Sequence, residues 1–313
     1  MKRVACIGEC MVELRERADA TMTRSYGGDT LNTAIYLARL GVSVDYVTAL
    51  GDDVWSDEML SAWQSEGVGI NLVVRLPRRL PGLYVIRTDE MGERRFYYWR
   101  DSAPARQLFS LPQTEALCES LASYDLVYFS GITLSLYDDD ERERLFASIA
   151  RCRKAGGRIA FDTNFRPQSW QDRSAAQSVY RRTFSNVDTL LASREDLELL
   201  FDSAGAMEFL ACQGVGERIL KLDGPACRVL GDGIDVIVKA PSVTAVDTTA
   251  AGDSFAAAYL AARLADCSVE DAARAGHRLA GQVVRHPGAV IPRSAMPEEL
   301  QVQLHRSSRE THT

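Results

Sequence analysis

Residues 247–255 read DTTAAGDSF and run directly into AAAYLAARLA, a stretch with the composition of a helix. We expect Thr248 or Thr249 to cap this helix, because a threonine hydroxyl accepts a backbone N–H of the first turn. A cap does not require Gly252, which weakens a helix, or an acid directly after it. The stretch is therefore either an ordinary capped helix with an acid in its first turn, or backbone that takes part in chemistry.

The chemical interpretation of this stretch begins with its backbone. The first N–H groups of a helix have no intrahelical partner, and together with the helix dipole they form a site for an anion. Gly252 and the small side chains of Ala250 and Ala251 let a bulky anion approach that backbone. Asp253 would repel a phosphate. It makes sense as a base that takes a proton from a hydroxyl, while the N–H groups hold the charge of a transferred phosphoryl group.

A second motif, GGDTLN at residues 27–32, precedes an amphipathic helix for which Asp29 is a candidate N-cap. Gly27 and Gly28 form a turn at which backbone can approach a ligand closely. Asp29 and Asn32 would then face that ligand and bond sugar hydroxyls. A glycine turn followed by a capping aspartate explains the same letters, so both interpretations stay open at this point.

The rest of the chain alternates apolar strands with amphipathic helices, which predicts an α/β fold with a mainly parallel sheet covered on both faces. Segments 11–26 and 81–101 break this rhythm with alternating polar and apolar residues, and the second reads as a hairpin with a turn at 89–92. They predict a small added sheet that serves as a lid over the carboxyl edge of the main sheet. We expect strands at 3–14, 42–51, 124–131, 158–164, 187–193 and 216–222, and helices at 29–40, 53–66, 141–157 and after residue 249.

The composition is that of a soluble globular protein, with 46% hydrophobic and 25% charged residues among 313. A formal net charge of −7 argues against nucleic acid as a partner, since no global positive field attracts phosphates. No apolar run is long enough to span a membrane, and the N-terminus reads as a strand and not as a signal peptide. The seven cysteines lack Cys-x-x-Cys spacing, which favours reduced thiols in a cytoplasmic protein over a disulfide frame or a zinc site.

GGDTLN and DTTAAGDSF together resemble the paired signatures of the PfkB (ribokinase-like) carbohydrate kinases, in the same order along the chain. The resemblance covers about residues 4 to 296, and it is greatest to the branch of that family that phosphorylates 2-keto-3-deoxygluconate. It implies a single ribokinase-like domain over 1–313, a three-layer α/β/α fold with a small β-sheet lid, formed by segments of about 11–26 and 81–101. It also implies ATP and Mg²⁺ as cofactors and transfer of a phosphoryl group to the 6-hydroxyl of the sugar acid. Further motifs that carry the resemblance are GECMVEL, YVTALGDD, FDTNFRP and GAVIPR.

The resemblance assigns roles to residues of this chain. Asp253 matches the catalytic base, and Ala250, Ala251 and Gly252 match the anion hole. Asp196 is expected to hold Mg²⁺ through water, although it stands where many relatives have another acid and is also explained as an exposed acid at a helix start. Besides Asp253, the matches for the sugar site are Gly28, Asp29, Asn32, Tyr84, Tyr97, Trp99, Arg100 and Arg166. The matches for the nucleotide site are Asn164, Arg166, Lys221, Gly224, Ala250, Gly252 and Gly288.

The residue types support a sugar acid independently, because the planar guanidinium fork of arginine binds a carboxylate through two bonds. Eight arginines fall between residues 75 and 106 of an otherwise acidic chain. We expect Arg100 and Arg166 to bind the carboxylate, and Arg94 and Arg95 to be solvated. Three alternatives remain: a neutral sugar such as fructose, a non-catalytic sugar-acid sensor on the same fold, and aromatics that merely pack beneath the lid. The hairpin could also bury an apolar face against a second copy, which would make a homo-oligomer.

Overall fold

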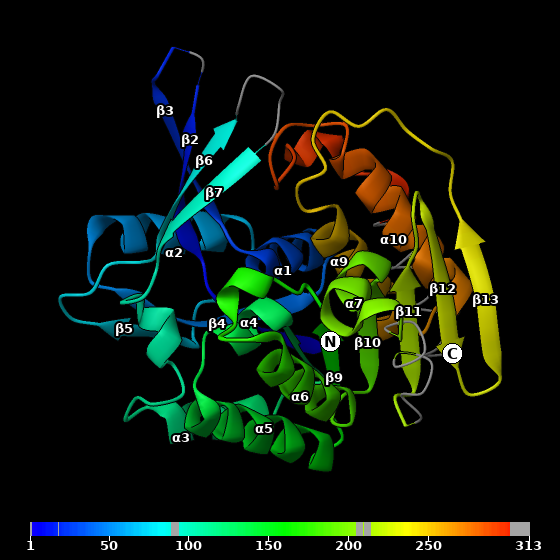
Figure 1. Ribbon diagram of the computed structural model, residues 1–313, viewed down its shortest axis with the longest axis horizontal. Coiled ribbons are helices and arrows are strands. Elements are labelled where there is room, and N and C mark those ends of the chain that lie inside the picture. Colours follow the sequence, from blue (N-terminus) through cyan, green and yellow to red (C-terminus); the bar gives the residue numbers. More distant parts are fainter. Residues whose placement is uncertain (1, 18, 89–93, 205–208, 210–213, 301–313) are drawn as a thin grey trace.

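The computed structural model describes residues 2–17, 19–88, 94–204, 209 and 214–300 (Figure 1). Within these ranges, nine strands form one sheet in the order β13-β12-β11-β10-β9-β8-β1-β4-β5, and four form a second in the order β3-β2-β6-β7. The expected turn at 89–92 and Cys212 lie outside the described residues. Each of the six cysteines that are described is buried and free of a disulfide. Among the described helices, none combines the length and the apolar character that crossing a membrane requires.

The large sheet is parallel from β5 through β11, and it turns antiparallel only at β12 and β13. The prediction of a mainly parallel sheet is therefore confirmed. Parallel strands place their carboxyl ends at one edge, which is where an α/β sheet binds its ligands. The strands are β1 (Arg3–Ile7), β4 (Ser43–Gly51), β5 (Val73–Leu76), β8 (Leu126–Ser130), β9 (Arg158–Asp162), β10 (Thr189–Ser193), β11 (Glu217–Lys221), β12 (Ala226–Gly231) and β13 (Ile234–Lys239).

Helices cover both faces of this sheet, because side chains alternate along each strand and feed two separate cores. Val4 and Cys6 of β1 belong to one core with α1, α2, α9 and α10, whereas Ala5 and Ile7 belong to the other with α3 to α7. The three-layer α/β/α prediction is confirmed. The helices are α1 (Asp29–Arg39), α2 (Val54–Ser65), α3 (Thr114–Leu121), α4 (Gly131–Ser135), α5 (Asp139–Lys154), α6 (Arg173–Phe184), α7 (Arg194–Phe201), α9 (Ala251–Leu264) and α10 (Val269–Val283).

The expected opening strand at 3–14 is wrong as one element. β1 ends at Ile7, and the chain enters the second sheet as β2 (Met11–Glu16). At the break, Gly8 packs closely against α1, where a Cβ atom would lie 2.0 Å from the hydroxyl oxygen of Thr30. Period-two alternation continues through the break, so the letters alone do not mark it.

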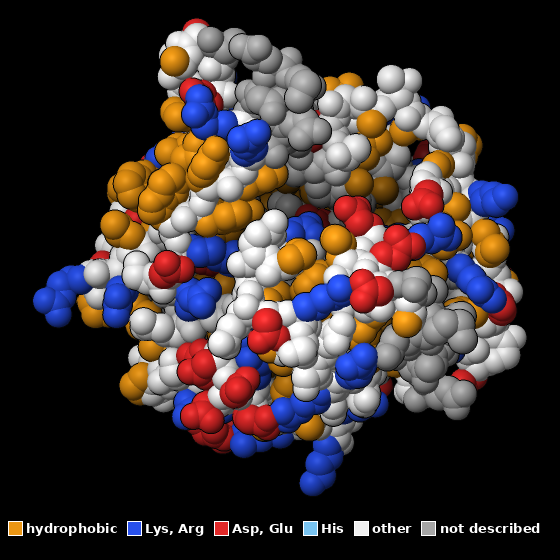
Figure 2. Space-filling model, viewed as in Figure 1, with side chains coloured by type: hydrophobic (Ala, Val, Ile, Leu, Met, Phe, Trp, Pro, Cys, Tyr) orange, Lys and Arg blue, Asp and Glu red, His pale blue; other side chains and the backbone are white. Residues whose placement is uncertain are grey.

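The second sheet combines β2 with β3 (Met22–Gly27), β6 (Leu83–Thr88) and β7 (Arg94–Trp99). It begins just past the carboxyl end of β1 and projects from that edge of the molecule (Figure 1). Hydrophobic side chains gather on its surface, and the molecule is hollowed beside it (Figure 2). The small sheet expected from segments 11–26 and 81–101 is thus present, and below we call these four strands the lid sheet.

Candidate active site

The start of α9 is built from backbone and not from a capping side chain. Its N-cap is Ala250, whose φ of 60° and ψ of 16° place it in the left-handed region, and no side chain of the described residues caps the helix. The prediction that Thr248 or Thr249 supplies the cap is wrong. Thr249 instead donates its N–H (3.0 Å) and its hydroxyl (2.6 Å) to Oδ1 of Asp247, because the turn at Ala250 separates it from the helix.

This turn determines which N–H groups remain at the helix start. The N–H of Ala251 donates to the carbonyl of Thr248 at 3.2 Å. The N–H groups of Gly252 and Asp253 follow in the first turn, where an α-helix offers no acceptor of its own. A Cβ atom on Gly252 would lie 3.4 Å from Nζ of Lys221, so the missing side chain keeps space open between this backbone and a cation.

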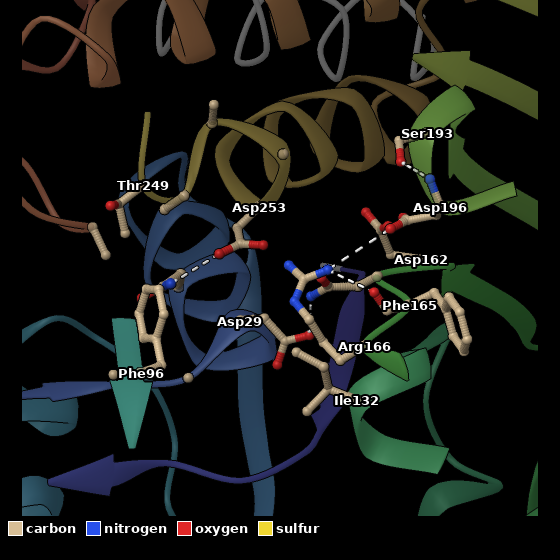
Figure 3. Close-up of a pocket in the computed structure, with 18 of the residues that line it drawn as sticks. Asp29, Phe96, Ile132, Asp162, Phe165, Arg166, Ser193, Asp196, Thr249 and Asp253 are labelled. Atoms are coloured by element: carbon tan, nitrogen blue, oxygen red, sulfur yellow. Dashed lines mark hydrogen bonds and ion pairs between the residues drawn. The ribbon is translucent and has the colours of Figure 1, made fainter. Parts of the chain in front are cut away.

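Asp253 projects from the first turn of α9 toward the start of α1 (Figure 3). Nδ2 of Asn32 donates to its Oδ2 at 2.8 Å, and the hydroxyl of Thr33 donates to its backbone carbonyl at 3.3 Å. Removal from water raises the pKa of Asp253 to about 8; the charge of Asp29 adds to the rise, and the bond from Asn32 opposes it. A carboxyl group that titrates near neutral pH is suited to take a proton from an alcohol.

The start of α1 faces the start of α9. α1 begins at Asp29, with Gly28 as an extended N-cap, so the prediction that Asp29 itself caps the helix is wrong. The carboxylate of Asp29 accepts a hydrogen bond of 2.7 Å from Nδ2 of Asn164, which follows β9 and has a φ of 28°. Gly28 lies so close to the preceding loop that a Cβ atom would be 2.2 Å from the carbonyl oxygen of Glu9.

Arg166 brings a positive charge to the opposite wall. Its side chain is 51% exposed, and its Nη1 lies 2.8 Å from the carbonyl oxygen of Phe165 and 3.7 Å from Oδ1 of Asp196. Asp196 is buried and accepts a hydrogen bond of 2.7 Å from the hydroxyl of Thr163. Figure 3 shows the guanidinium group of Arg166 extending into the space between Asp29 and Asp196. One terminal nitrogen of this arginine is therefore engaged by the protein, while about half of the side chain surface remains accessible to a ligand.

A second cation, Lys221, stands at the carboxyl end of β11. Its Nζ lies 3.2 and 2.9 Å from the two carboxylate oxygens of Asp162, which ends β9. Burial disfavours the charge of Lys221, but the carboxylates around it, Asp162 first and then Asp196 and Asp253, together outweigh burial and leave the pKa of the lysine above its ordinary value. The ammonium group thus stays charged beside the start of α9.

These residues line one pocket of about 740 Å³, which is within the usual size range of small-molecule sites. From the predicted site residues, the pocket brings together Gly28, Asp29, Asn32, Tyr84, Asn164, Arg166, Asp196, Lys221, Ala250, Ala251, Gly252 and Asp253. The arrangement offers a proton acceptor, helix N–H groups, two cations and several groups for hydroxyls. That set suits transfer of an anionic group to an alcohol.

Comparison with known proteins agrees with this chemistry. Residues 1–296 match the model of the pfkB family carbohydrate kinases. This chain belongs to that family. It is 44% identical over 307 residues to the 2-dehydro-3-deoxygluconokinase of Escherichia coli K12. The aligned part makes up 95% of this chain and 99% of the relative.

Solved structures show the same fold. The 2-dehydro-3-deoxygluconokinase of Thermotoga maritima superposes with a TM-score of 0.82 at 21% identity, covering 97% of this chain and 100% of that one. A fructokinase of Xylella fastidiosa with bound ATP gives a TM-score of 0.81 at 23% identity, covering 98% and 99% of the two chains. The expected ribokinase-like fold of this kinase is therefore confirmed.

The geometry of this pfkB kinase corrects the predicted aromatic wall by one residue. Tyr84 pairs with Tyr98 across β6 and β7, so Tyr97 and Trp99 lie on the opposite face of the lid sheet. Phe96 and Tyr98 line the pocket, and Tyr97 and Trp99 do not. A shift of one residue exchanges the two faces of a strand, and the run FYYW offers aromatic residues at every position.

Three other predicted residues do not line the pocket of the kinase: Arg100, Gly224 and Gly288. Arg100, at the end of β7, pairs with the buried carboxylate of Glu9, and its role toward a sugar acid stays a prediction. Gly224 (φ 74°) forms the turn after β11. Gly288 (φ 84°) donates its N–H to Oδ2 of Asp247 at 3.0 Å, and its neighbour Ala289 lines the pocket.

Three acids that line the pocket of the kinase were not predicted from the sequence: Glu13, Asp162 and Glu195. Glu13 lies on β2, where its carboxylate accepts hydrogen bonds from the hydroxyls of Tyr84 and, at 3.0 Å, Ser25. Asp162 ends a parallel strand, and that position is itself a signal for a ligand site. Glu13 gave no such signal, because an acid in an alternating edge segment is also explained by solvent exposure.

Proposed function

We propose that this kinase transfers the γ-phosphoryl group of ATP to the 6-hydroxyl of 2-keto-3-deoxy-D-gluconate. The observation that carries the proposal is the convergence of Asp253, the start of α9 and Arg166 in one pocket. The 44% identity to a 2-dehydro-3-deoxygluconokinase over nearly the whole chain supports the choice of sugar acid.

Asp253 acts in this scheme as the general base. It accepts the proton of the 6-hydroxyl while the sugar oxygen forms a bond to the γ-phosphorus, and the bond from that phosphorus to the β–γ bridging oxygen breaks to release ADP. The bond from Asn32 holds the carboxylate in place at 2.8 Å. The start of α9 from Ala250 to Asp253 is the proposed anion hole, where the N–H groups of Gly252 and Asp253 are fixed dipoles that stabilise the charge developing on the transferred group.

Recognition of the sugar acid is divided between two walls. Arg166 presents the exposed guanidinium group to which the substrate carboxylate would bind through two hydrogen bonds. Glu13 and Asp29 are acids, so they would repel that carboxylate and accept bonds from sugar hydroxyls instead. The two walls thereby orient the substrate with its 6-hydroxyl toward Asp253.

The nucleotide would lie along the edge formed by Lys221, Gly224 and Gly288. Lys221 stays charged beside Gly252 and would neutralise phosphate oxygens. Among the described residues, no group of three or more His, Cys, Asp or Glu side chains could enclose a metal ion. Asp162 and Asp196 are two of the carboxylates that line the pocket, and such a pair fits Mg²⁺, which proteins commonly hold through one or two carboxylates together with substrate phosphates and water. When bound, Mg²⁺ neutralises charge on the phosphates.

A coupled assay for ADP release over a panel of sugars tests the proposal. The panel contains 2-keto-3-deoxygluconate, its C4 epimer, gluconate, fructose and ribose, each at several concentrations with ATP and Mg²⁺. We expect the highest kcat/KM for 2-keto-3-deoxygluconate. A preference for fructose would replace the sugar acid by a neutral sugar, and thermal stabilisation by the sugar acid without ADP release would indicate a sensor.

We further propose that the kinase forms a homo-oligomer through the outer face of the lid sheet and works in the cytoplasm. Met22, Tyr97 and Trp99 are 50%, 43% and 61% exposed, which leaves large apolar side chains in water. Buried, reduced thiols suit the cytoplasm. Light scattering after size exclusion should give a mass above that of one chain, and Trp99→Glu should reduce it; a monomeric wild type would contradict the oligomer.

A further inference from the structure

Arg15 of β2 lies between two carboxylates that belong to different parts of the site. Its Nη2 is 3.5 Å from Oε1 of Glu13 on the same strand, and its Nη1 is 3.6 Å from Oδ2 of Asp247 near the start of α9. The arginine side chain is 29% exposed, while those of Glu13 and Asp247 are 14% and 4% exposed. Partial burial keeps such a pair from being screened as fully as a surface ion pair.

Each carboxylate anchors a different set of groups. Glu13 lines the pocket and holds the hydroxyl of Tyr84, so it belongs to the wall that would receive the sugar. Asp247 holds the N–H and hydroxyl of Thr249 through one oxygen and the N–H of Gly288 through the other. It therefore fixes the turn that precedes the anion hole and the loop beside the proposed nucleotide edge.

We propose that Arg15 is a positioning residue that couples sugar-acid binding at the lid sheet to nucleotide binding at the start of α9. This role rests on the kinase function proposed above. A hydroxyl bound to Glu13 fixes that carboxylate and, through it, the guanidinium group. A fixed guanidinium group holds Asp247 and the backbone of Thr249 and Gly288 in place. The coupling is reciprocal, so a bound nucleotide must also favour the sugar acid.

The fork of arginine is required because two nitrogen atoms contact two separate carboxylates. A lysine in its place carries the charge but has a single nitrogen on a flexible stem, so it holds one carboxylate well and not both. Arg15→Lys should therefore restore only part of the coupling. Arg17 lies on the same part of the chain, is exposed and donates to the hydroxyl of Thr23 at 3.1 Å, so Arg17→Met is a matched control for charge.

The test compares dissociation constants of a non-hydrolysable ATP analogue with Mg²⁺, measured by calorimetry with and without saturating 2-keto-3-deoxygluconate. We expect the sugar acid to tighten analogue binding about 10-fold in the wild type and in Arg17→Met, and to leave it almost unchanged in Arg15→Met. Arg15→Lys should give an intermediate ratio. Thermal melting shows whether Arg15→Met folds. If it does not fold, the ratio measured in Arg15→Lys still decides the test.

The measured quantity is the ratio of the analogue's dissociation constants without and with the sugar acid. Two results would overturn the inference: the same ratio in Arg15→Met as in the wild type, or a ratio of one in the wild type. Loss of stability alone would lower the fraction of active protein without changing the ratio of two dissociation constants. The panel assay on the wild type separates this inference from the proposed function. If the wild type phosphorylates the sugar acid and Arg15→Met keeps full coupling, only the role of Arg15 is refuted and the proposed function stands.

Discussion

The start of α9 and the lid sheet meet at one pocket but are built in opposite ways. α9 begins with backbone N–H groups, small residues and one acid. The rest of the helix is buried between α1 and α10. It packs so closely on α10 that a Cβ atom on Gly276 would lie 2.7 Å from the ring of Phe255. The lid sheet presents aromatic rings and ion pairs, and the exposed side chains among its described residues lie mainly on β3 and β7. Under the proposed function, the chemistry falls to the backbone and Asp253 at the start of α9, and the choice of substrate falls to side chains of the lid sheet and Arg166.

The largest effect that sharpens this comparison is expected from Asp253→Asn. Removal of a general base should lower kcat by about 10³-fold, while KM for the sugar acid changes little, because an amide keeps the shape but not the basicity. Steady-state kinetics with 2-keto-3-deoxygluconate measure both. Asp271→Asn, in the first turn of α10, is the matched control. A kcat near that of the wild type would remove Asp253 from the base role.

Gly252→Ala should lower kcat about 10-fold, through steric hindrance and not through loss of a base. The added methyl group would lie 3.4 Å from Nζ of Lys221, in the space proposed for the transferred group. Helix propensity alone makes alanine the better residue there by about 0.5–1 kcal/mol, so the melting temperature should not fall. Gly281→Ala, at an open position of α10, is the control and should leave kcat unchanged. Equal kcat in both variants would refute the steric role of Gly252.

Tyr98→Phe and Tyr97→Phe test the two faces of the lid sheet. Only Tyr98 lines the pocket, so removing its hydroxyl should raise KM for the sugar acid about 5-fold, as expected for one lost hydrogen bond. Tyr97→Phe removes the same atom from the opposite face and should leave KM unchanged. Steady-state kinetics on the two variants measure both KM values. A larger rise in KM from Tyr97→Phe would indicate that the face of β7 that carries Tyr97 lines the pocket.

The smallest effect concerns stability and pH. The pKa of Asp253 is about 8 in the folded chain, against about 3.9 for an unperturbed aspartate. The folded state therefore binds more protons than the unfolded state between these values, and stability must fall as pH rises through that range. Asp253→Asn removes this loss, so it should raise the melting temperature by a few degrees at pH 8.5 and less at pH 5. A pH-independent difference would contradict the raised pKa.

Most of the large sheet could be predicted from the sequence, because buried parallel strands are apolar at every position and glycines mark the helix ends. Gly41 and Gly67, with φ of 85° and 84°, follow α1 and α2 as expected. The break after Ile7 could not be predicted, since the close packing found there joins Gly8 to Thr30, which lies on an element distant in sequence. The same limit applies to the cap of α9, where a left-handed Ala250 replaces the expected threonine.

The residues of the candidate site fall into the same two groups, those that local sequence predicts and those whose place depends on contacts distant in sequence. Residues in glycine-rich motifs at helix starts, such as Asp253 and Asn32, were predicted because spacing along one helix fixes their direction. Tyr98 was missed in favour of its neighbours, since FYYW carries no polar residue to mark which face is outward. Glu13 and Arg15 were missed because their partners lie on other strands and near α9, far away in sequence.

We propose that Arg166 and the lid sheet select the substrate while the start of α9 performs the transfer. The most direct test is the ratio of kcat/KM for 2-keto-3-deoxygluconate to that for fructose, measured in the wild type and in Arg166→Ala, with the exposed Arg194→Ala as control. We expect Arg166→Ala to lower this ratio about 10- to 100-fold by raising KM for the sugar acid, because a charged hydrogen-bonded pair is lost. An unchanged ratio would contradict it.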